Sequence, residues 1–228
     1  MSHRAAVVVL LEDNHLLALN KPPGLLTQPS PAEADSLENR AKEWIRRTKQ
    51  KPGQVFLHAV HRLDRDVSGV VLFARTSKAL ARLQESIRSR KVTKIYHALV
   101  ESLPEEETAR LEHWLVHDSH HARVVKPHAR EAKLAVLEYR VVRHVYELFL
   151  LEVKLETGRY HQIRAQLAAI GCPIAGDGRY GSRYPAKGRI ALHHRSLVIA
   201  HPVKNEEVAI EAPYPVDWPG VSTRPPGQ

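Results

Sequence analysis

The sequence predicts an α+β domain built on a mixed, mostly antiparallel sheet with flanking helices. Short β-rich runs outnumber helical ones, and many connections between them have the length of hairpins. Hydrophobic residues make up 43% of the 228 residues, which is enough to bury the core of one substantial domain. No glycine-rich phosphate loop is present in the sequence, which argues against a bound nucleotide cofactor. We assign the domain to residues 1–215 and a loose tail to residues 216–228.

The strands are predicted from apolar runs that turn residues interrupt. Residues 5–11 and 15–20 flank the polar turn EDN and predict a strand pair. The following stretch, KPPGLLTQPSP, is a loop, because proline and glycine interrupt regular structure there. The remaining strands are expected at residues 55–60, 69–74, 91–101, 134–142, 145–155, 190–192, 197–200 and 208–210.

Three helices and a hairpin complete the predicted fold. Asp35 begins a capping box and the first helix, and Ser77 caps the second. Residues 160–170 have helical periodicity, and Gly171 ends that helix. Residues 103–133 are polar and rich in His and Arg, so we expect a hairpin that protrudes from the core. The predicted buried faces of the first two helices are Leu37, Ala41, Trp44 and Ile45, and Leu80, Ala81, Leu83 and Ile87.

The charge balance indicates a polyanionic partner. Lys and Arg number 34 against 25 acidic residues, which gives a net charge of +9 and a pI near 9.8. Nucleic acid is the commonest such partner, although a merely basic soluble protein is the alternative. The single cysteine, Cys172, excludes an internal disulfide framework and fits a reducing cytoplasm. The apolar run at 5–11 is too short to span a membrane. We therefore expect a cytoplasmic protein without membrane contact.

One segment carries more polar residues than a connection between strands requires. HRLDRDVSG, residues 61–69, lies between two β-rich runs that a short turn would join. Asp64 stands between Arg62 and Arg65, whose charges would keep its carboxylate ionised. An aspartate in a loop is more often a turn former or part of an exposed ion pair. A strand end is nevertheless a rigid place to hold a nucleophile, so Asp64 is a candidate.

Two further clusters are candidates for a site. In TGRYHQIRAQ, residues 157–166, Arg164 has apolar neighbours, so it is either half-buried with a carboxylate partner or reaches solvent. In KIYHA, residues 94–98, Tyr96 shares a strand face with Lys94. The tyrosine ring either fills the core or stacks on a planar ligand such as a nucleobase.

The 15 histidines raise the question of a metal site. The closest pairs are His58 with His61, and His193 with His194. Neither spacing repeats a zinc-binding pattern, and one cysteine is available as a further ligand. Adjacent residues on a strand point to opposite faces, so His193 and His194 would not bind one ion together. We therefore expect no metal.

Together these stretches resemble the RluA-type family of RNA pseudouridine synthases. HRLDRDVSG resembles the catalytic-aspartate motif of that family, NKPPGLLTQPS its lysine–proline motif, and KIYHALV its tyrosine motif. TGRYHQIRAQLAAIGCPIAGDGRYG resembles the arginine-bearing motif, and IALHHRSLVIAHP the closing strand pair. The matches keep the family order from residue 15 to about residue 215, and HRLDR with SG is the most specific of them.

The resemblance implies an activity and a set of residues. The uracil of a uridine would be detached from its ribose, turned and rejoined through carbon, in a central cleft and without a cofactor. Asp64 would be the nucleophile, Arg164 its ion-pair partner and Tyr96 the ring beside the target base. Arg62 would fill the space that the flipped nucleotide leaves. The residues expected to contact RNA or take part in base flipping are His61, Arg62 and Arg65.

The sequence departs from the family pattern at three positions, none of them a predicted catalytic residue. These are Val67 and Tyr160, each in place of a threonine, and Gln166, where a histidine is common. The departures therefore bear on the choice of substrate. Many family members also carry an N-terminal S4-type RNA-binding domain, whereas this chain starts in the catalytic region. Target recognition would then come from the catalytic domain, including the basic segment 103–133.

We expect a monomeric enzyme that acts on structured transfer or ribosomal RNA. The alternative is a protein of the same fold that has lost activity and acts in RNA binding or as an RNA chaperone. The presence of Asp64, Tyr96 and Arg164 favours the enzyme. A metal-dependent hydrolase is a distant third interpretation.

Overall fold

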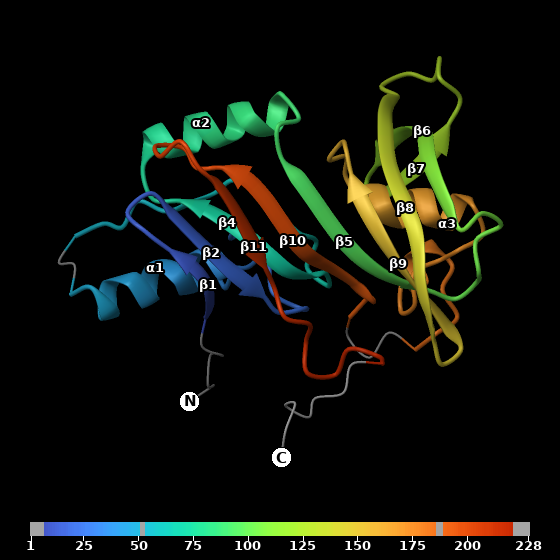
Figure 1. Cartoon of the computed structure of the whole chain (residues 1–228), viewed down its shortest axis with the longest axis horizontal. Helices are drawn as coiled ribbons and strands as arrows, with labels where there is room; N and C mark the ends of the chain where they lie inside the picture. The colour runs from blue at the N-terminus through green and yellow to red at the C-terminus, as the bar shows by residue number, and fades with distance from the viewer. Residues whose placement is uncertain (1–6, 51–52, 186–188, 221–228) are drawn as a thin grey trace. The chain divides into compact units, whose positions relative to one another are not determined.

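The computed structural model describes residues 7–50, 53–185 and 189–220, and its strands and helices form two compact units (Figure 1). The first unit comprises residues 1–92 and 195–213, and the second comprises residues 93–194 and 214–228. Among the described residues, three α-helices accompany a sheet-rich chain, so the predicted α+β class is confirmed. None of the helices in these ranges is long and apolar enough to cross a membrane.

The first unit is a sheet of antiparallel strands in which every residue of β4 is buried. Strand β2 pairs with β1 on one side and with β4 on the other. Strand β3 also pairs with β4, and β11 pairs with β10. In chain order the elements of this unit are β1 (Val8–Glu12), β2 (Leu16–Lys21), α1 (Leu37–Thr48), β3 (His58–Ala59), β4 (Ser68–Ala74), α2 (Ser77–Arg88), the end of β10 (Leu192–Ala200) and β11 (Glu207–Glu211).

The two helices of the first unit begin with caps that differ from the predicted ones by one residue. Ser36 caps α1 and Thr76 caps α2, and each side chain accepts a hydrogen bond at 3.2 Å from the amide three residues later. Asp35, the predicted first cap, forms an ion pair with Arg40 instead. Ser77, the predicted second cap, is the first residue of α2. Several neighbouring polar residues can cap a helix, so the sequence alone did not separate them.

The core of the first unit joins α2 to the sheet. Leu83 is buried, as predicted, but Ala81 is exposed. Ala79 is buried in its place, because residues four apart lie on one face of a helix. The buried members of this core are Leu16, Ala18, Val70, Leu72, Ala74, Ala79, Leu83, Leu197, Ile199, Ile210 and Ala212.

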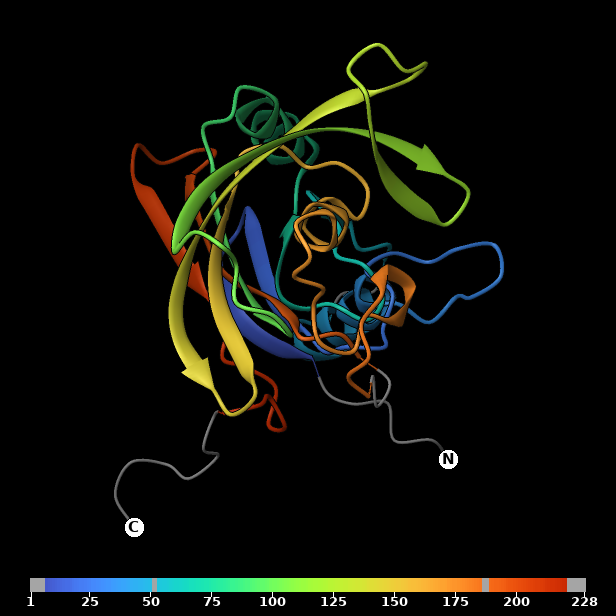
Figure 2. The ribbon, with the colours of Figure 1, turned by 90° about the vertical axis from the view of Figure 1, so that its right-hand side faces the viewer.

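The second unit is a five-stranded antiparallel sheet with one α-helix. Its strand order is β5-β9-β8-β6-β7. Helix α3 contacts β6 and β7, and Figure 2 shows the curved strands passing around this helix. In chain order the elements are β5 (Thr93–Val100), β6 (Thr108–Asp118), β7 (His121–Val125), β8 (Lys133–Val145), β9 (Leu148–Leu155), α3 (Gln162–Ala169) and the short 3₁₀ helix η1 (Gly178–Tyr180).

The predicted hairpin at 103–133 is confirmed as β6 and β7, but the expectation that it stands apart from the core was wrong. Strand β6 also pairs with β8, which places it inside the sheet. Leu115 of β6 and Ala122 of β7 are buried together with Ala135 and Ala165. The polar residues of the hairpin lie on its other face. Because polar and buried residues alternate along each strand, the average composition of the segment is polar, and its buried side chains were not recognised from the sequence.

Several predicted boundaries in the second half of the chain were also wrong. The turn expected at residues 143–144 lies three residues later, at 146–147, because β8 continues past an irregularity in register after Val141, and Tyr146 turns with a φ of 53°. Helix α3 begins at Gln162, since His161 has a left-handed backbone with a φ of 49°. Gly171, with a φ of 75°, follows the helix as predicted.

Predicted strands near the two ends of the chain were partly correct. Strand β3 has two residues where 55–60 were expected. The run at 197–200 is the end of strand β10, which starts at residue 192, so residues 190 and 191 of the strand expected at 190–192 lie outside it. Trp218, in the segment predicted as a tail, is 4% exposed and stacks on Tyr214. Residues 5–6 of the first predicted strand and 221–228 of the tail lie outside the described residues.

Candidate active site

Asp64 lies just before β4, and hydrogen bonds from an earlier loop fix the residues on both sides of it. The Thr27 hydroxyl donates to the carbonyl of Leu63 at 3.0 Å and accepts from the amide of Leu63 at 3.1 Å. The amide of Gly24 donates to the carbonyl of Arg65 at 2.9 Å. The loop KPPGLLT therefore holds the main chain at the two neighbours of Asp64.

Lys21 strengthens this attachment from inside the first unit. Its side chain is fully buried at the end of β2. Its ammonium donates to the carbonyl oxygens of Pro22, Leu25 and Arg65, at 3.0, 2.6 and 2.7 Å. An ammonium has three N–H donors, so each donor has an acceptor. Burial lowers the pKa of Lys21 to about 7, and the carboxylates of Asp66 and Asp64 oppose this shift.

The other predicted residues of HRLDR differ in exposure. Arg62 is exposed. Arg65 is also exposed, and it forms an ion pair with Glu33. His61 is half-buried, and its Nε2 accepts a hydrogen bond from the amide of Leu72 at 3.2 Å. The two arginines are exposed, as a residue that contacts RNA must be. The RNA contacts of His61, Arg62 and Arg65 stay predictions.

Arg164 is buried in α3 and paired with a carboxylate outside the predicted set. Its Nε and Nη2 atoms donate to the two oxygens of Asp177 at 2.6 and 2.8 Å. The two side chains are 8% and 1% exposed, and the ring of Tyr180 lies over the guanidinium, 4.9 Å from Cζ to the ring centroid. Of the two alternatives for Arg164, the buried one is confirmed. Its pairing with Asp64 stays a prediction.

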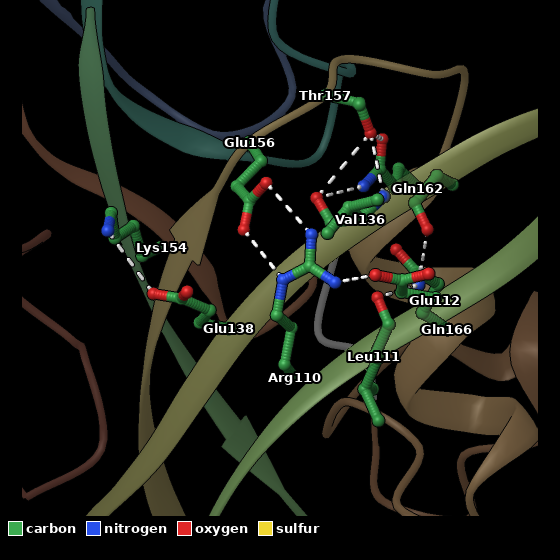
Figure 3. A network of polar contacts seen from close by, with 11 residues as sticks. Arg110, Leu111, Glu112, Val136, Glu138, Lys154, Glu156, Thr157, Gln162 and Gln166 are labelled. Carbon is green, nitrogen blue, oxygen red and sulfur yellow. Dashed lines mark hydrogen bonds and ion pairs between the residues drawn. The ribbon is translucent and has the colours of Figure 1, made fainter.

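The helix that carries this arginine is fastened to two strands (Figure 3). The Thr157 hydroxyl donates to Oε1 of Gln162 at 2.8 Å, and Nε2 of Gln162 donates to the carbonyl of Val136 in β8 at 3.0 Å. One turn later, Nε2 of Gln166 donates to the carbonyl of Leu111 in β6 at 3.2 Å. These side-chain bonds fix the start and middle of α3 against the sheet, so the sheet sets the position of the buried guanidinium.

Tyr180 connects this arginine to the β6–β7 hairpin. Its hydroxyl accepts a hydrogen bond from the amide of Ala122 in β7 at 2.8 Å and lies 2.9 Å from Nδ1 of His161. Burial, with the positive charges of Arg164 and Arg179 nearby, lowers the pKa of His161 to about 3. In the tautomer that carries its proton on Nε2, a neutral His161 accepts at Nδ1 from the Tyr180 hydroxyl.

Tyr96 is 6% exposed in β5. Its ring stacks on His194, with 4.4 Å between centroids and 13° between the ring planes. Lys94, Tyr96 and Ala98 are all buried, which confirms that they share one face of the strand. The ring thus lies in the core of the second unit, and its contact with a target base stays a prediction.

Comparison with known proteins decides the family. A model of the RNA pseudouridylate synthase family matches residues 15–169. The chain belongs to the RluA-type RNA pseudouridine synthases. The uncharacterized RNA pseudouridine synthase YhcT of Bacillus subtilis is 34% identical over 92% of this chain and 69% of its own length. Ribosomal large subunit pseudouridine synthase C of Vibrio cholerae is 34% identical over 90% of this chain and 65% of its own length.

A solved structure confirms the fold of this pseudouridine synthase. Human RNA pseudouridylate synthase domain containing 4 superimposes with a TM-score of 0.76, at 24% identity, over 91% of this chain and 88% of that chain. The chain spans about two thirds of the length of the two bacterial relatives.

Four residues that support the candidate residues were missing from the predicted set: Lys21 and Thr27 in the first unit, and Asp177 and Tyr180 in the second. All four lie inside stretches that carry the family resemblance, NKPPGLLTQPS and the segment ending in GDGRYG. The signal was therefore present in the sequence. What was missing was the partner of each side chain, because these partners lie far away in the chain or in another element.

Proposed function

We propose that this pseudouridine synthase isomerises a uridine in structured transfer or ribosomal RNA, with Asp64 as the nucleophile. The observation that carries this proposal is the anchoring of Leu63 and Arg65 by Thr27 and Lys21, on either side of Asp64. A reacting carboxylate gains from such support, because a small displacement from the productive geometry is costly in rate.

The reaction leaves the composition of the nucleotide unchanged. The bond between C1′ and N1 breaks, the uracil turns, and a bond between C1′ and C5 forms. C5 loses its proton and N1 gains one. The carboxylate of Asp64 adds either to C6 of the base or to C1′ of the ribose, and is released at the end of the cycle.

In the same proposal, Arg164 supports the nucleophile by its charge and Tyr96 lies beside the target base. Both side chains are at least nine-tenths buried, and charges interact more strongly in such low-dielectric surroundings than in water. The two hydrogen bonds that Arg164 donates to Asp177 hold the plane of the guanidinium, so Arg164 offers a positive charge in a fixed position.

The target uridine must be flipped out of the paired RNA before these groups can act on it. Extracting a base from paired RNA costs a few kcal/mol, which contacts elsewhere must offset. Cations in the segment 103–133 are suited to this task. Within the described part of the chain, Lys126, Arg130 and Lys133 form no ion pair, so their charges are available for phosphates. Arg62, which is exposed, would fill the space that the base leaves.

The experiment compares wild type with Asp64→Asn on transcribed transfer and ribosomal RNA, followed by chemical mapping of pseudouridine. Asp66→Asn is the matched control, since it removes a carboxylate two residues away. We expect product from wild type and from the control, and none from Asp64→Asn, with RNA affinity within about twofold of wild type. Binding without product from any of the three proteins would support an RNA-binding protein instead.

A further inference from the structure

Lys94 is a buried lysine for which the described residues provide no partner. It lies in β5 and is 8% exposed. Across residues 7–50, 53–185 and 189–220, its ammonium forms no hydrogen bond and no ion pair. Burial lowers the pKa of Lys94. A buried ammonium that lacks a counter-charge is costly, so a folded chain that keeps one invites a functional explanation.

Lys21 shows that a buried lysine in this structure can have acceptors for its ammonium. Lys21 is also buried, but three carbonyl oxygens surround its ammonium. The described part of the chain therefore supplies acceptors to one buried lysine and none to the other. A missing acceptor at Lys94 is one that a ligand can supply.

The end of the Lys94 side chain lies where a ligand can reach it. A Cβ atom placed on Gly158 would be 3.9 Å from Nζ of Lys94, and Gly158 itself is exposed. The stem is thus buried, while the ammonium lies beside an exposed main chain that carries no side chain. Tyr96 is two residues further along the same face of β5, which corresponds to roughly 7 Å along a strand. That separation is within the dimensions of one nucleotide.

The charge of Lys94 favours an anion over a neutral acceptor as its ligand. The phosphodiester is the negatively charged group of RNA. Lysine is suited to it, because its ammonium is a compact point charge. The oxygens of uracil are neutral acceptors, so they would satisfy an N–H donor without neutralising the ammonium.

We propose that Lys94 binds a backbone phosphate of the RNA, next to the uridine that is isomerised. This rests on the proposed function, in which Tyr96 lies beside the target base. The free protein then carries a buried charge that the substrate neutralises, and Lys94 adds a contact at the reacting nucleotide to those of the hairpin.

The test uses Lys94→Met, which keeps the length of the side chain and removes its charge. Lys154→Met is the matched control, because Lys154 lies on the neighbouring strand β9, is exposed and is paired with Glu138 at 3.2 Å. For each protein, the affinity for a transcript that wild type modifies is measured as a function of KCl concentration. Single-turnover pseudouridine formation and the melting temperature are measured in parallel.

We expect Lys94→Met to lower the slope of log affinity against log salt by about 0.7 to 0.9, the loss of one phosphate contact. Its rate should fall by about tenfold or more, while its melting temperature stays equal or rises, since an unpaired buried charge has been removed. Lys154→Met should change neither rate nor slope. A structural role for Lys94 would instead lower the melting temperature.

A neutral methylphosphonate next to the target uridine gives a second readout. It should weaken binding to wild type and have no further effect on Lys94→Met. The inference is overturned if Lys94→Met keeps the wild-type slope and rate. It is also overturned if the variant loses activity together with a lower melting temperature and an unchanged salt slope. If wild type made no pseudouridine, the proposed function would fail, and the salt slope would still decide whether Lys94 contacts phosphate.

Discussion

The hydroxyl of Thr27 donates a hydrogen bond to the carbonyl of Leu63 and accepts one from the amide of the same residue. Both residues are buried, with 3% and 8% of their surface exposed. Leu63 precedes Asp64, so a side chain 36 positions earlier fixes the main chain beside the proposed nucleophile. No regular strand pairing supplies these two bonds at Leu63, because β3 ends at Ala59 and β4 begins at Ser68.

Replacing Thr27 by valine keeps the shape of the side chain and removes both hydrogen bonds. The amide and carbonyl of Leu63 would then lack their partner in a buried position, at a cost of about 1–3 kcal/mol in unfolding free energy. We expect single-turnover pseudouridine formation to fall about tenfold or more, with RNA affinity nearly unchanged. Urea unfolding and a rate assay check this. Thr27→Ser should retain most of the rate, and a fully active Thr27→Val would contradict the positioning role.

Lys21 and Lys94 should respond in opposite ways to the same substitution. Lys21→Met removes the donor of three carbonyl oxygens, including that of Arg65. We expect it to lower the free energy of unfolding by about 3 kcal/mol or more. Lys94→Met should leave the stability equal or higher. Thermal melting of the two variants under one condition makes the comparison, and equal losses would refute the distinction between a satisfied and an unpaired lysine.

The parts of the fold that follow from local patterns could be predicted from the sequence. Apolar runs bounded by turn residues located β2 and β4, and HRLDRDVSG located Asp64 between them. The hairpin at 103–133 was also predicted, but its polar average concealed Leu115 and Ala122 in the core. At residues 143–144, two polar residues in a row resembled a turn, although β8 continues through them.

Contacts between distant residues could not be predicted in the same way. Thr27 and Leu63, or Tyr180 and Ala122, meet only after the strands between them have paired. The need for a carboxylate at Arg164 followed from burial, but the identity of Asp177 did not, because several acids were available in the sequence. Physical reasoning thus specified the kind of partner and left the choice of residue to tertiary structure.

Asp177 should act on catalysis through Arg164. Asp177→Asn would remove the charge of the carboxylate that pairs with the buried guanidinium of Arg164, and breaking such a pair typically costs about 3–5 kcal/mol. We expect pseudouridine formation to fall by about a hundredfold or more, with a smaller loss of RNA affinity. Circular dichroism and urea unfolding show whether the variant is folded, and single-turnover assays then measure the rate.

Tyr180→Phe tests the same arrangement with a smaller change. It removes one hydroxyl and leaves the ring over Arg164, so Ala122 and His161 lose a hydrogen-bond partner. We expect about a tenfold loss of rate with RNA affinity preserved. Tyr139→Phe is the control, because it removes a tyrosine hydroxyl that bonds to the carbonyl of Glu106 elsewhere in the second unit. A wild-type rate in Tyr180→Phe would show that the link to the hairpin is not used.

His161 should make the protein less stable as the pH falls. Its pKa is about 3 in the folded protein and about 6.5 in an unfolded chain. Between these values the unfolded state binds more protons, so the free energy of unfolding decreases with falling pH. At about pH 4.5 the loss is about 2 kcal/mol relative to pH 6.5.

The control is His161→Gln, which cannot titrate. Between about pH 6.5 and pH 4.5, the unfolding free energy of His161→Gln should decrease less than that of wild type. The difference between the two proteins should equal the contribution of His161 given above. Nuclear magnetic resonance of the wild-type imidazole at about pH 5 should show a neutral ring with its proton on Nε2, because Nδ1 accepts from the Tyr180 hydroxyl. The prediction is contradicted if unfolding free energy depends on pH in the same way in both proteins, or if the ring is protonated at that pH. Nδ1 of His161 would then not be the acceptor of the Tyr180 hydroxyl.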